Sequence, residues 1–426
     1  MPPVTSRPDR FLYLLLAVVL VVLLYNLHLW AITGTETIIV DISRDMLARQ
    51  NFMHPQPGVP AVSHLPLPLW FTSLGMTLWG INPFGARFFV QVGIVLQVVL
   101  VYRIALRLFG SHQVGLFAGL VYLSCPLVLA CSRYLSAEIF LATFELSAIY
   151  CILLYHLDKR PIALYGLAGS LALGVLCRGL LCLVLPLSVG AYVLLFGPQN
   201  YYIHWRHSAA AAAMGIGLGG FWFVHGSTHL PEFWSATRQL FWQETFFGPH
   251  PHWQPVLSLI AGCLPWWIVV VPNLVGSLWQ NPTIAQVAVC WLTLPLGFYT
   301  LTGSVPWTGL LPTVAGVCIL ISYLIQLLTP GQVWQYSRWF AQIYSTMAIL
   351  ALVVPLGYQL LGQSISVTWP MAFTALVTLG VVGVLYRFIQ TGIRFRLVAM
   401  ALVPSLMLLL YGGYWIDANG AAVPGQ

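Results

Sequence analysis

The sequence predicts an all-α protein that crosses a membrane many times, and three observations support this. Of the 426 residues, 59% are hydrophobic and only 6% are charged, whereas soluble domains average about 45–50% and about 25%. The apolar residues form runs close to the roughly 20 residues that a helix needs to cross a bilayer. The few basic residues lie between these runs and favour one side. This composition excludes soluble enzymes, disordered proteins and nucleic-acid binders, because it cannot cover a water-facing surface.

The apolar runs predict about thirteen transmembrane helices within a single transmembrane domain, residues 1–426, with no soluble C-terminal domain. The fifth and sixth runs are short and meet in a turn at Arg178–Gly179. The expected spans are 11–32, 88–107, 113–131, 138–157, 163–177, 180–196, 208–226, 255–279, 284–301, 309–328, 339–361, 367–386 and 397–413.

The arginines and the single lysine predict the orientation of the chain. If the N-terminus is cytoplasmic, eleven of the 17 basic residues fall on the inner side and six on the outer side. Because basic residues accumulate in cytoplasmic loops, we expect an inner (plasma) membrane protein with its N-terminus inside, its C-terminus outside and its active face outward. Most of the acids fall on the outer side.

Two long segments are expected on the outer side, residues 33–87 and 227–254. Residues 37–50 are predicted to form an amphipathic helix lying in the membrane interface. Its apolar side carries Ile38, Ile39, Ile42, Met46 and Leu47, and its charged residues Asp41, Arg44, Asp45 and Arg49 lie largely opposite. Pro66 to Gly80 forms a second apolar segment. The aromatic residues of both segments predict immersion at the membrane surface or a groove for a lipid chain. The residues expected in such a groove are Trp70, Phe246, Phe247 and Trp253.

Two charged residues of the outer side are candidates for chemistry. Glu36 is the first acid after the first span, where a carboxylate can take a proton from an acceptor hydroxyl. The simpler reading of Glu36 is an acid at a helix start. Arg178 lies at a membrane rim, where a guanidinium can hold a phosphate, although such an arginine can also extend to the lipid headgroups.

Neither a metal site nor a disulfide framework is expected. The eight cysteines lie almost wholly inside apolar runs, without a CxxC pair. His250 and His252 form an HxH pair with His225 and His229 nearby, but nothing in the sequence makes these side chains converge on one ion. We therefore expect no metal and no cofactor.

The first outer loop resembles that of glycosyltransferase family 39, which includes the aminoarabinose transferases of lipid A and the protein O-mannosyltransferases. Its residues Thr35 to Phe52 are similar to a family loop that reads Asp-Glu and then Ile-Ser-Arg-Glu-Met-Leu. Further similarities keep the family's order along the chain. They are Ser63 to Leu67 (Glu-Lys-Pro in the family), Phe84 to Arg87 (Phe-Gly-x-Arg), Cys177 to Gly179 (Thr-Lys-Gly), Phe233–Trp234 and Ile260 to Trp266.

The resemblance implies a GT-C type bundle that transfers a sugar from a polyprenyl-phosphate carrier to a lipid or protein acceptor. It implies Glu36 as the catalytic base, with Asp41 as the second candidate. The carrier phosphate is then held by Arg178, with Arg44 and His64 as further candidates.

Two alternatives remain open. The family aspartate aligns with Thr35, and the Glu-Lys of Glu-Lys-Pro is replaced by His64-Leu65, whereas Arg178 keeps the charge of the family lysine. These replacements favour a non-catalytic relative that binds a lipid-linked sugar or a partner. The other alternative is a lipid or solute transporter, for which paired repeats with broken helices are typical.

Overall fold

The computed structural model describes residues 23–24, 27, 30, 32, 34–53, 65–196, 204–229, 233–280, 288–360, 369–388 and 393–419. These residues are almost entirely helical and contain no strand, as the sequence predicts. The α-helices are α2 (Thr35–Arg49), α3 (Pro66–Trp79), α4 (Pro83–Phe109), α5 (His112–Ser124), α6 (Pro126–Cys131), α7 (Ala137–Asp158), α8 (Ile162–Arg178), α9 (Val184–Phe196), α10 (Trp205–His229), α11 (Phe233–Phe246), α12 (Gln254–Gly262), α13 (Trp267–Gln280), α15 (Leu294–Thr302), α16 (Leu311–Leu327), α17 (Pro330–Leu360), α18 (Trp369–Phe388) and α19 (Ile393–Asn419).

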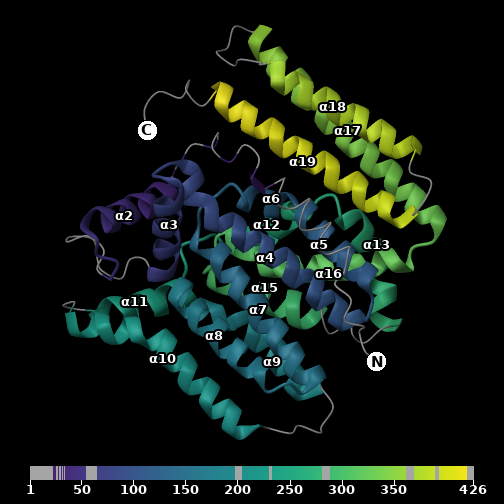
Figure 1. Cartoon of the computed structure of the whole chain (residues 1–426). Coiled ribbons are helices and arrows are strands. Elements are labelled where there is room, and N and C mark those ends of the chain that lie inside the picture. The colour runs from purple at the N-terminus through teal and green to yellow at the C-terminus, as the bar shows by residue number, and fades with distance from the viewer. Residues whose placement is uncertain are drawn as a thin grey trace.

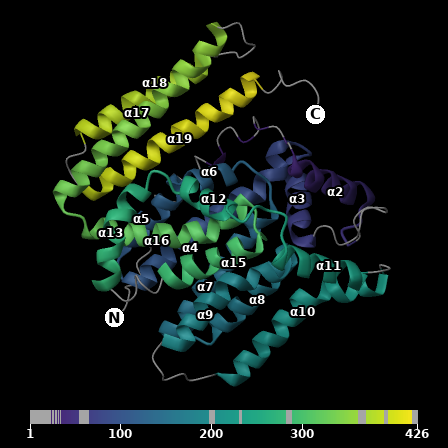
Figure 2. The same cartoon turned by 180° about the vertical axis from the view of Figure 1, so that it is seen from behind.

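Three groups of helices surround a buried centre. α4, α5, α7 and α16 form this centre, and nearly every residue of α16 is buried. α17, α18 and α19 pack together along one side, while α10 and α11 lie at the opposite side (Figure 1). The view from behind shows the same grouping, with α2 and α3 beside the start of α4 (Figure 2).

The helix boundaries follow from local sequence signals. α4 starts at Pro83 after Asn82, whose side chain accepts a hydrogen bond of 2.7 Å from the backbone N–H of Gly85. It ends at Gly110, whose φ of 66° is left-handed backbone that glycine adopts without strain. α3 and α4 cross closely, because a Cβ built on Gly75 would lie only 2.3 Å from the carbonyl oxygen of Gly85.

Seven stretches of the described residues are long and apolar enough to cross a membrane, and the helix pair α12 and α13 is an eighth candidate. The chain is therefore a multi-pass membrane protein. The expected number of thirteen spans is not confirmed. The first expected span, 11–32, lies mostly outside the described residues. The third is interrupted at Pro126, and the eighth bends by 105° between α12 and α13.

One of the seven stretches, Ile162–Gly190, reverses its direction near Arg178. A Cβ built on Gly174 of α8 would lie 2.8 Å from the Cβ of Cys182, and one built on Gly190 of α9 would lie 4.0 Å from Ile152 of α7. Eight residues of continuous helix would separate Gly174 from Cys182 by about 12 Å. α9 therefore packs against α7 and runs in the opposite direction to α8, and Arg178 lies at the turn between them.

The predicted amphipathic helix 37–50 corresponds to α2, which packs its buried Ile39, Ile42 and Met46 toward α3. The predicted apolar face is wrong at Ile38, whose side chain is exposed. The second predicted segment, Pro66 to Gly80, corresponds to α3.

Candidate active site

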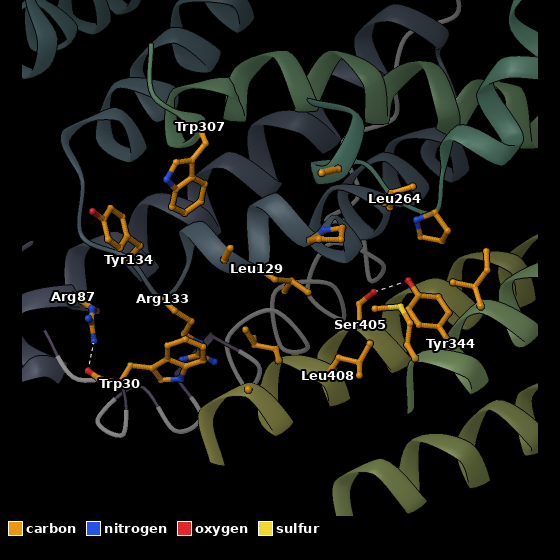
Figure 3. Close-up of a pocket in the computed structure, with 18 of the residues that line it drawn as sticks. Trp30, Arg87, Leu129, Arg133, Tyr134, Leu264, Trp307, Tyr344, Ser405 and Leu408 are labelled. Atoms are coloured by element: carbon orange, nitrogen blue, oxygen red, sulfur yellow. Dashed lines mark hydrogen bonds between the residues drawn. The ribbon is translucent and has the colours of Figure 1, made fainter. Parts of the chain in front are cut away.

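A cavity of about 880 Å³ lies between α6, the bend from α12 to α13, α17 and α19. Its wall is mostly apolar. Figure 3 shows Trp30, Arg87 and Arg133 toward one end, and Tyr344 and Ser405, joined by a hydrogen bond of 2.7 Å, toward the other. The apolar lining residues are Pro126, Leu129, Ala130, Ala261, Leu264, Pro265, Ile268, Ile343, Met347, Leu408 and Leu409.

The charged end of the cavity contains a buried ion pair between Glu36 of α2 and Arg87 of α4. Nη2 of Arg87 lies 2.6 Å from Oε2 of Glu36, and its Nε donates to Oε1 over 3.0 Å. The backbone N–H of Leu135 also donates to Oε1, over 2.5 Å. Arg87 further donates to the carbonyl oxygen of Trp30 over 2.5 Å. Both charged side chains are almost inaccessible, with exposed fractions of 1% and 2%, so the pair is fixed from several sides.

Arg133 is the third charged residue of this wall. It lies in the connection from α6 to α7 and donates a hydrogen bond of 3.1 Å to the carbonyl oxygen of Leu23. Burial and the neighbouring Arg87 lower the pKa of Arg133 to about 10, so the side chain stays cationic at neutral pH. Two guanidinium groups and one carboxylate give this end of the cavity a net positive charge, which favours an anionic ligand.

Arg178 pairs with Glu138, not with Glu36. Its Nε lies 3.1 Å from Oε1 of Glu138, the first acid of α7. Glu138 also accepts a hydrogen bond of 2.6 Å from the hydroxyl of Ser136, whose oxygen lies 3.3 Å from that of Thr308. Neither Arg178 nor Glu138 lines the cavity. Their side chains are 23% and 10% exposed, so this pair is more accessible than the pair of Glu36 and Arg87.

The connection between α6 and α7 holds both acids. The backbone of Leu135 binds Glu36, and the side chain of the next residue, Ser136, binds Glu138. His250 lies near the second pair: burial and then Arg178 lower the pKa of His250, whereas Glu138 raises it. A hydrogen-bonded segment of two residues thus joins two acid–arginine pairs from four helices.

The remaining candidates for catalysis and phosphate binding lie elsewhere. Asp41 and Arg44 are on the exposed face of α2, 3.6 Å apart, with exposed fractions of 65% and 50%. Neither lines the cavity. His64 lies outside the described residues.

The four aromatic groove candidates do not line the cavity either. Trp70 donates to the carbonyl oxygen of Phe52 over 2.7 Å. Phe246 stacks on Trp242 with ring centroids 5.3 Å apart, while Phe247 and Trp253 are largely exposed.

The sequence did not single out Arg87 and Arg133 as candidate site residues, and it indicated for Glu138 only a position at the outer side of the membrane. Arg87 belongs to the Phe-Gly-x-Arg similarity, which was the available signal. Among the described residues, no group of three or more His, Cys, Asp or Glu side chains is arranged to hold a metal ion. His252 instead lies 2.8 Å from the carbonyl oxygen of Thr300.

Comparison with known proteins places these features among membrane transferases. Residues 59–223 match the family model described as dolichyl-phosphate-mannose-protein mannosyltransferase. Among curated proteins, the chain is similar to the undecaprenyl phosphate-alpha-4-amino-4-deoxy-L-arabinose arabinosyl transferases of Pectobacterium atrosepticum (25% identity, 80% of this chain, 66% of the relative) and Pseudomonas aeruginosa (29%, 76% and 61%). The chain thus spans somewhat less than two thirds of the length of these relatives.

Solved structures show the same fold. ArnT from Cupriavidus metallidurans, bound to undecaprenyl phosphate, matches with a TM-score of 0.78 at 19% identity, over 96% of this chain and 79% of that one. Its apo state matches equally well, with a TM-score of 0.78 over 95% and 77%. In sequence and in fold the chain is therefore similar to the undecaprenyl phosphate aminoarabinose transferases, which confirms the resemblance identified from its first loop and the GT-C type bundle that it implies.

Proposed function

We propose that this protein is a glycosyltransferase that moves a sugar from a polyprenyl-phosphate carrier to a lipid or protein acceptor. The observation that supports this most is the cavity of about 880 Å³, with its long apolar wall and its cationic end. That volume is at the upper end of small-molecule sites, roughly 300–1,000 Å³. An apolar wall suits part of a prenyl chain, and the charged end suits the phosphate.

The phosphate position that we propose is beside Arg133, with Arg87 behind it. Arg87 is already neutralised by Glu36 over 2.6 Å, so Arg133 supplies most of the attraction for an anion. A guanidinium can hold a phosphate through two parallel hydrogen bonds. This proposal differs from the sequence expectation, in which Arg178, Arg44 and His64 bind the phosphate, because Arg178 and Arg44 both lie outside the cavity wall.

The transfer itself needs one base. The acceptor oxygen attacks the anomeric carbon, the bond from that carbon to the phosphate oxygen breaks, and the carrier phosphate leaves with the electron pair. The acceptor proton passes to a carboxylate. The sequence suggests Glu36 or Asp41 for this role, and the contacts favour Glu138. Glu36 already accepts three hydrogen bonds, and Asp41 lies on an exposed helix face.

Glu138 has the better position for proton transfer in this proposal. It is adjacent to the turn that carries Trp307, a residue of the cavity wall, since a Cβ built on Gly309 would lie 3.4 Å from its Cγ. Arg178 then orients the Glu138 carboxylate and keeps it charged. The group that gives its proton to the base is the acceptor hydroxyl.

The test is transfer of labelled sugar from a polyprenyl-phosphate donor by the purified protein in detergent. We expect Glu138→Gln to lower the rate by about 10²–10⁴, the usual loss of a positioned base, while the protein stays folded. Asp45→Asn is the matched control, because Asp45 is another acid of the same outer region and pairs with Arg49 over 3.1 Å. An active Glu138→Gln variant would exclude Glu138 as the base and return the role to Glu36 or Asp41.

A second candidate function is binding of a lipid-linked sugar without transfer. The replacement of the family aspartate by Thr35 favours it. Wild-type protein that binds the donor but transfers no sugar to any lipid or protein acceptor would establish this second function.

The orientation also stands as a proposal: an inner-membrane protein with a cytoplasmic N-terminus, an outer C-terminus and an outward-facing site. The distribution of basic residues supports it. A reporter that works only outside the cytoplasm should be active when it is fused to the C-terminus. Activity of a C-terminal reporter that works only in the cytoplasm would contradict the orientation.

A further inference from the structure

A polar depression lies on an exposed face of α17, and it shares no lining residue with the cavity. It has a volume of about 590 Å³, and its lining residues are Trp334, Gln335, Arg338, Trp339, Gln342 and Tyr386. All but Tyr386 belong to the first half of α17. The cavity begins at the next residues of the same helix, since Ile343, Tyr344 and Met347 line it.

Buried Arg396 of α19 packs against two of these lining residues, Trp334 and Tyr386. Its guanidinium carbon lies 3.9 Å from the ring centroid of Trp334 and 4.9 Å from that of Tyr386, both within the range of cation–π attraction. It also donates to the carbonyl oxygen of Tyr386. The two rings are thus held in place by a cation beneath them, and exposed Arg338 adds a second charge at the rim.

The stretch of sequence that contains the depression has basic but no acidic residues. The sequence contains no aspartate or glutamate between Glu244 and Asp417, whereas it contains four arginines there. Two of these arginines have neutral hydrogen-bond partners. Arg394 donates to the amide oxygen of Gln326 over 3.2 Å, and Arg396 donates to the backbone carbonyl of Tyr386. No acid nearby in the sequence balances the positive charge of these arginines, so an anion would complement it.

The exposed face of α17 changes character along the helix. Gln335, Arg338, Trp339 and Gln342 are exposed in its first half. On the same face, about two turns further on, the exposed residues are aliphatic: Ile349, Leu350, Val353 and Leu356. Tryptophan concentrates where the bilayer meets water. A polar, cationic and aromatic patch followed by an aliphatic stripe is the surface that a phospholipid covers with its headgroup and its acyl chains.

We propose that this depression binds the headgroup of an anionic phospholipid. The phosphate lies against Arg338 and above Trp334, and the acyl chains follow the aliphatic stripe of α17. Basic pockets between transmembrane helices recognise anionic headgroups in this way. The aliphatic stripe is what favours a lipid over a soluble anion or an acidic protein segment. This site is separate from the proposed donor site, and transfer activity is not needed to test it.

The experiment measures lipid binding to the full-length protein by native mass spectrometry, in a detergent doped with equal amounts of phosphatidylglycerol and phosphatidylcholine. We expect wild-type protein to retain phosphatidylglycerol preferentially. Arg338→Gln should lower its affinity about fivefold, the usual effect of one basic residue at an anionic membrane surface. Gln335→Glu, which places a negative charge at an exposed position of the same rim, should lower it at least as much.

Two control variants show whether the effect is local. Arg206→Gln removes another exposed arginine, whose guanidinium carbon lies 5.4 Å from the ring centroid of Trp205 on α10. Gln113→Glu adds an acid at an exposed position of α5. Both should leave phosphatidylglycerol binding unchanged.

Four results would overturn the proposal. They are equal retention of the two lipids by wild-type protein, unchanged affinity in Arg338→Gln, an equal loss in Arg206→Gln, and displacement of phosphatidylglycerol by millimolar inorganic phosphate. The last result would identify a simple anion site. Each of these measurements concerns lipid binding at α17, so a negative result would not contradict the proposed glycosyl transfer. A protein without transfer activity would likewise not contradict the lipid site.

Discussion

The ion pair of Glu36 and Arg87 gives the sharpest prediction about stability. In Glu36→Gln the amide keeps one acceptor oxygen where the carboxylate accepts three hydrogen bonds, and its NH₂ group competes with the donors of Arg87. The guanidinium, with only 2% of its side chain exposed, then remains buried without its counter-charge. Breaking a buried pair from one side costs about 3–5 kcal/mol, so we expect the free energy of unfolding to fall by that amount.

A double-mutant cycle separates the pair from its surroundings. Arg87→Met should cost a similar amount, because it leaves the Glu36 carboxylate buried with only the N–H of Leu135 as a partner among the bonds described above. The cycle consists of Glu36→Leu, Arg87→Met and their combination, and the combined variant removes both charges. The combined variant should lose much less than the sum of the single variants, since replacing both members of a buried pair is often nearly neutral. The N–H of Leu135 and the carbonyl of Trp30 then remain, at about 1–3 kcal/mol for each buried group without a partner.

The assay is reversible unfolding in mixed detergent micelles, with Arg44→Gln as the control for an exposed arginine 3.6 Å from an acid. That control should cost less than about 1 kcal/mol. A Glu36→Gln variant within about 1 kcal/mol of wild type, or single effects that simply add, would refute the view that this pair is a mutually dependent part of the fold. Transfer measured on Glu36→Gln must accordingly be normalised to the folded fraction.

Three further predictions concern packing and titration. Gly85→Ala should destabilise the protein by about 1–3 kcal/mol, because its Cβ would lie 2.3 Å from the carbonyl oxygen of Gly80, whereas Gly217→Ala, with open space around it, should be neutral or stabilising; equal unfolding midpoints would contradict this. Tyr122→Phe removes the donor that lies 2.7 Å from the buried amide oxygen of Gln97 and should cost about 1–3 kcal/mol, measured in the same assay; no loss would mean that another donor replaces it. The pKa of His250 is lowered, first by burial and then by Arg178, so the folded state binds its proton less readily than the unfolded state does. Its contribution to stability is then complete above about pH 6.5 and is lost as the pH falls below that value, and His250→Gln should flatten this part of the pH profile of unfolding; an unchanged profile would exclude His250 as the source.

Hydropathy and loop order predicted more of the fold than of the site. The bundle, helix α2 and the turn at Arg178 follow from properties of neighbouring residues, which a single sequence displays directly. The partner of Glu36 does not follow from neighbouring residues, because Arg87 is 51 residues away and contacts Glu36 from another helix. The same applies to Arg178, whose partner Glu138 lies on another helix. Hydropathy gives the depth of a residue in the membrane, and Glu36 and Arg178 were both expected at the outer boundary, but it carries no information about which helices are neighbours.

The span count is not confirmed, for a related reason. A window of apolar residues does not distinguish a straight helix from one that breaks at Pro126 or bends by 105° between α12 and α13. Both interruptions border the cavity, since Pro126, Leu264 and Pro265 all line it. The irregular backbone at these positions, which a hydropathy window does not detect, leaves space for the cavity inside the bundle.

The short connection that holds both acids has a consequence for ligand binding. Leu135 binds Glu36 at the cavity end, and Ser136 binds Glu138 beside Arg178, so two consecutive residues contact both ion pairs. An anion that pulls Arg87 away from Glu36 changes the hydrogen bond to Leu135 and, through it, the orientation of the Ser136 hydroxyl. By thermodynamic reciprocity, an acceptor that displaces Arg178 from Glu138 alters the affinity for that anion by the same factor. Donor and acceptor affinities should therefore be interdependent even when the two molecules never touch.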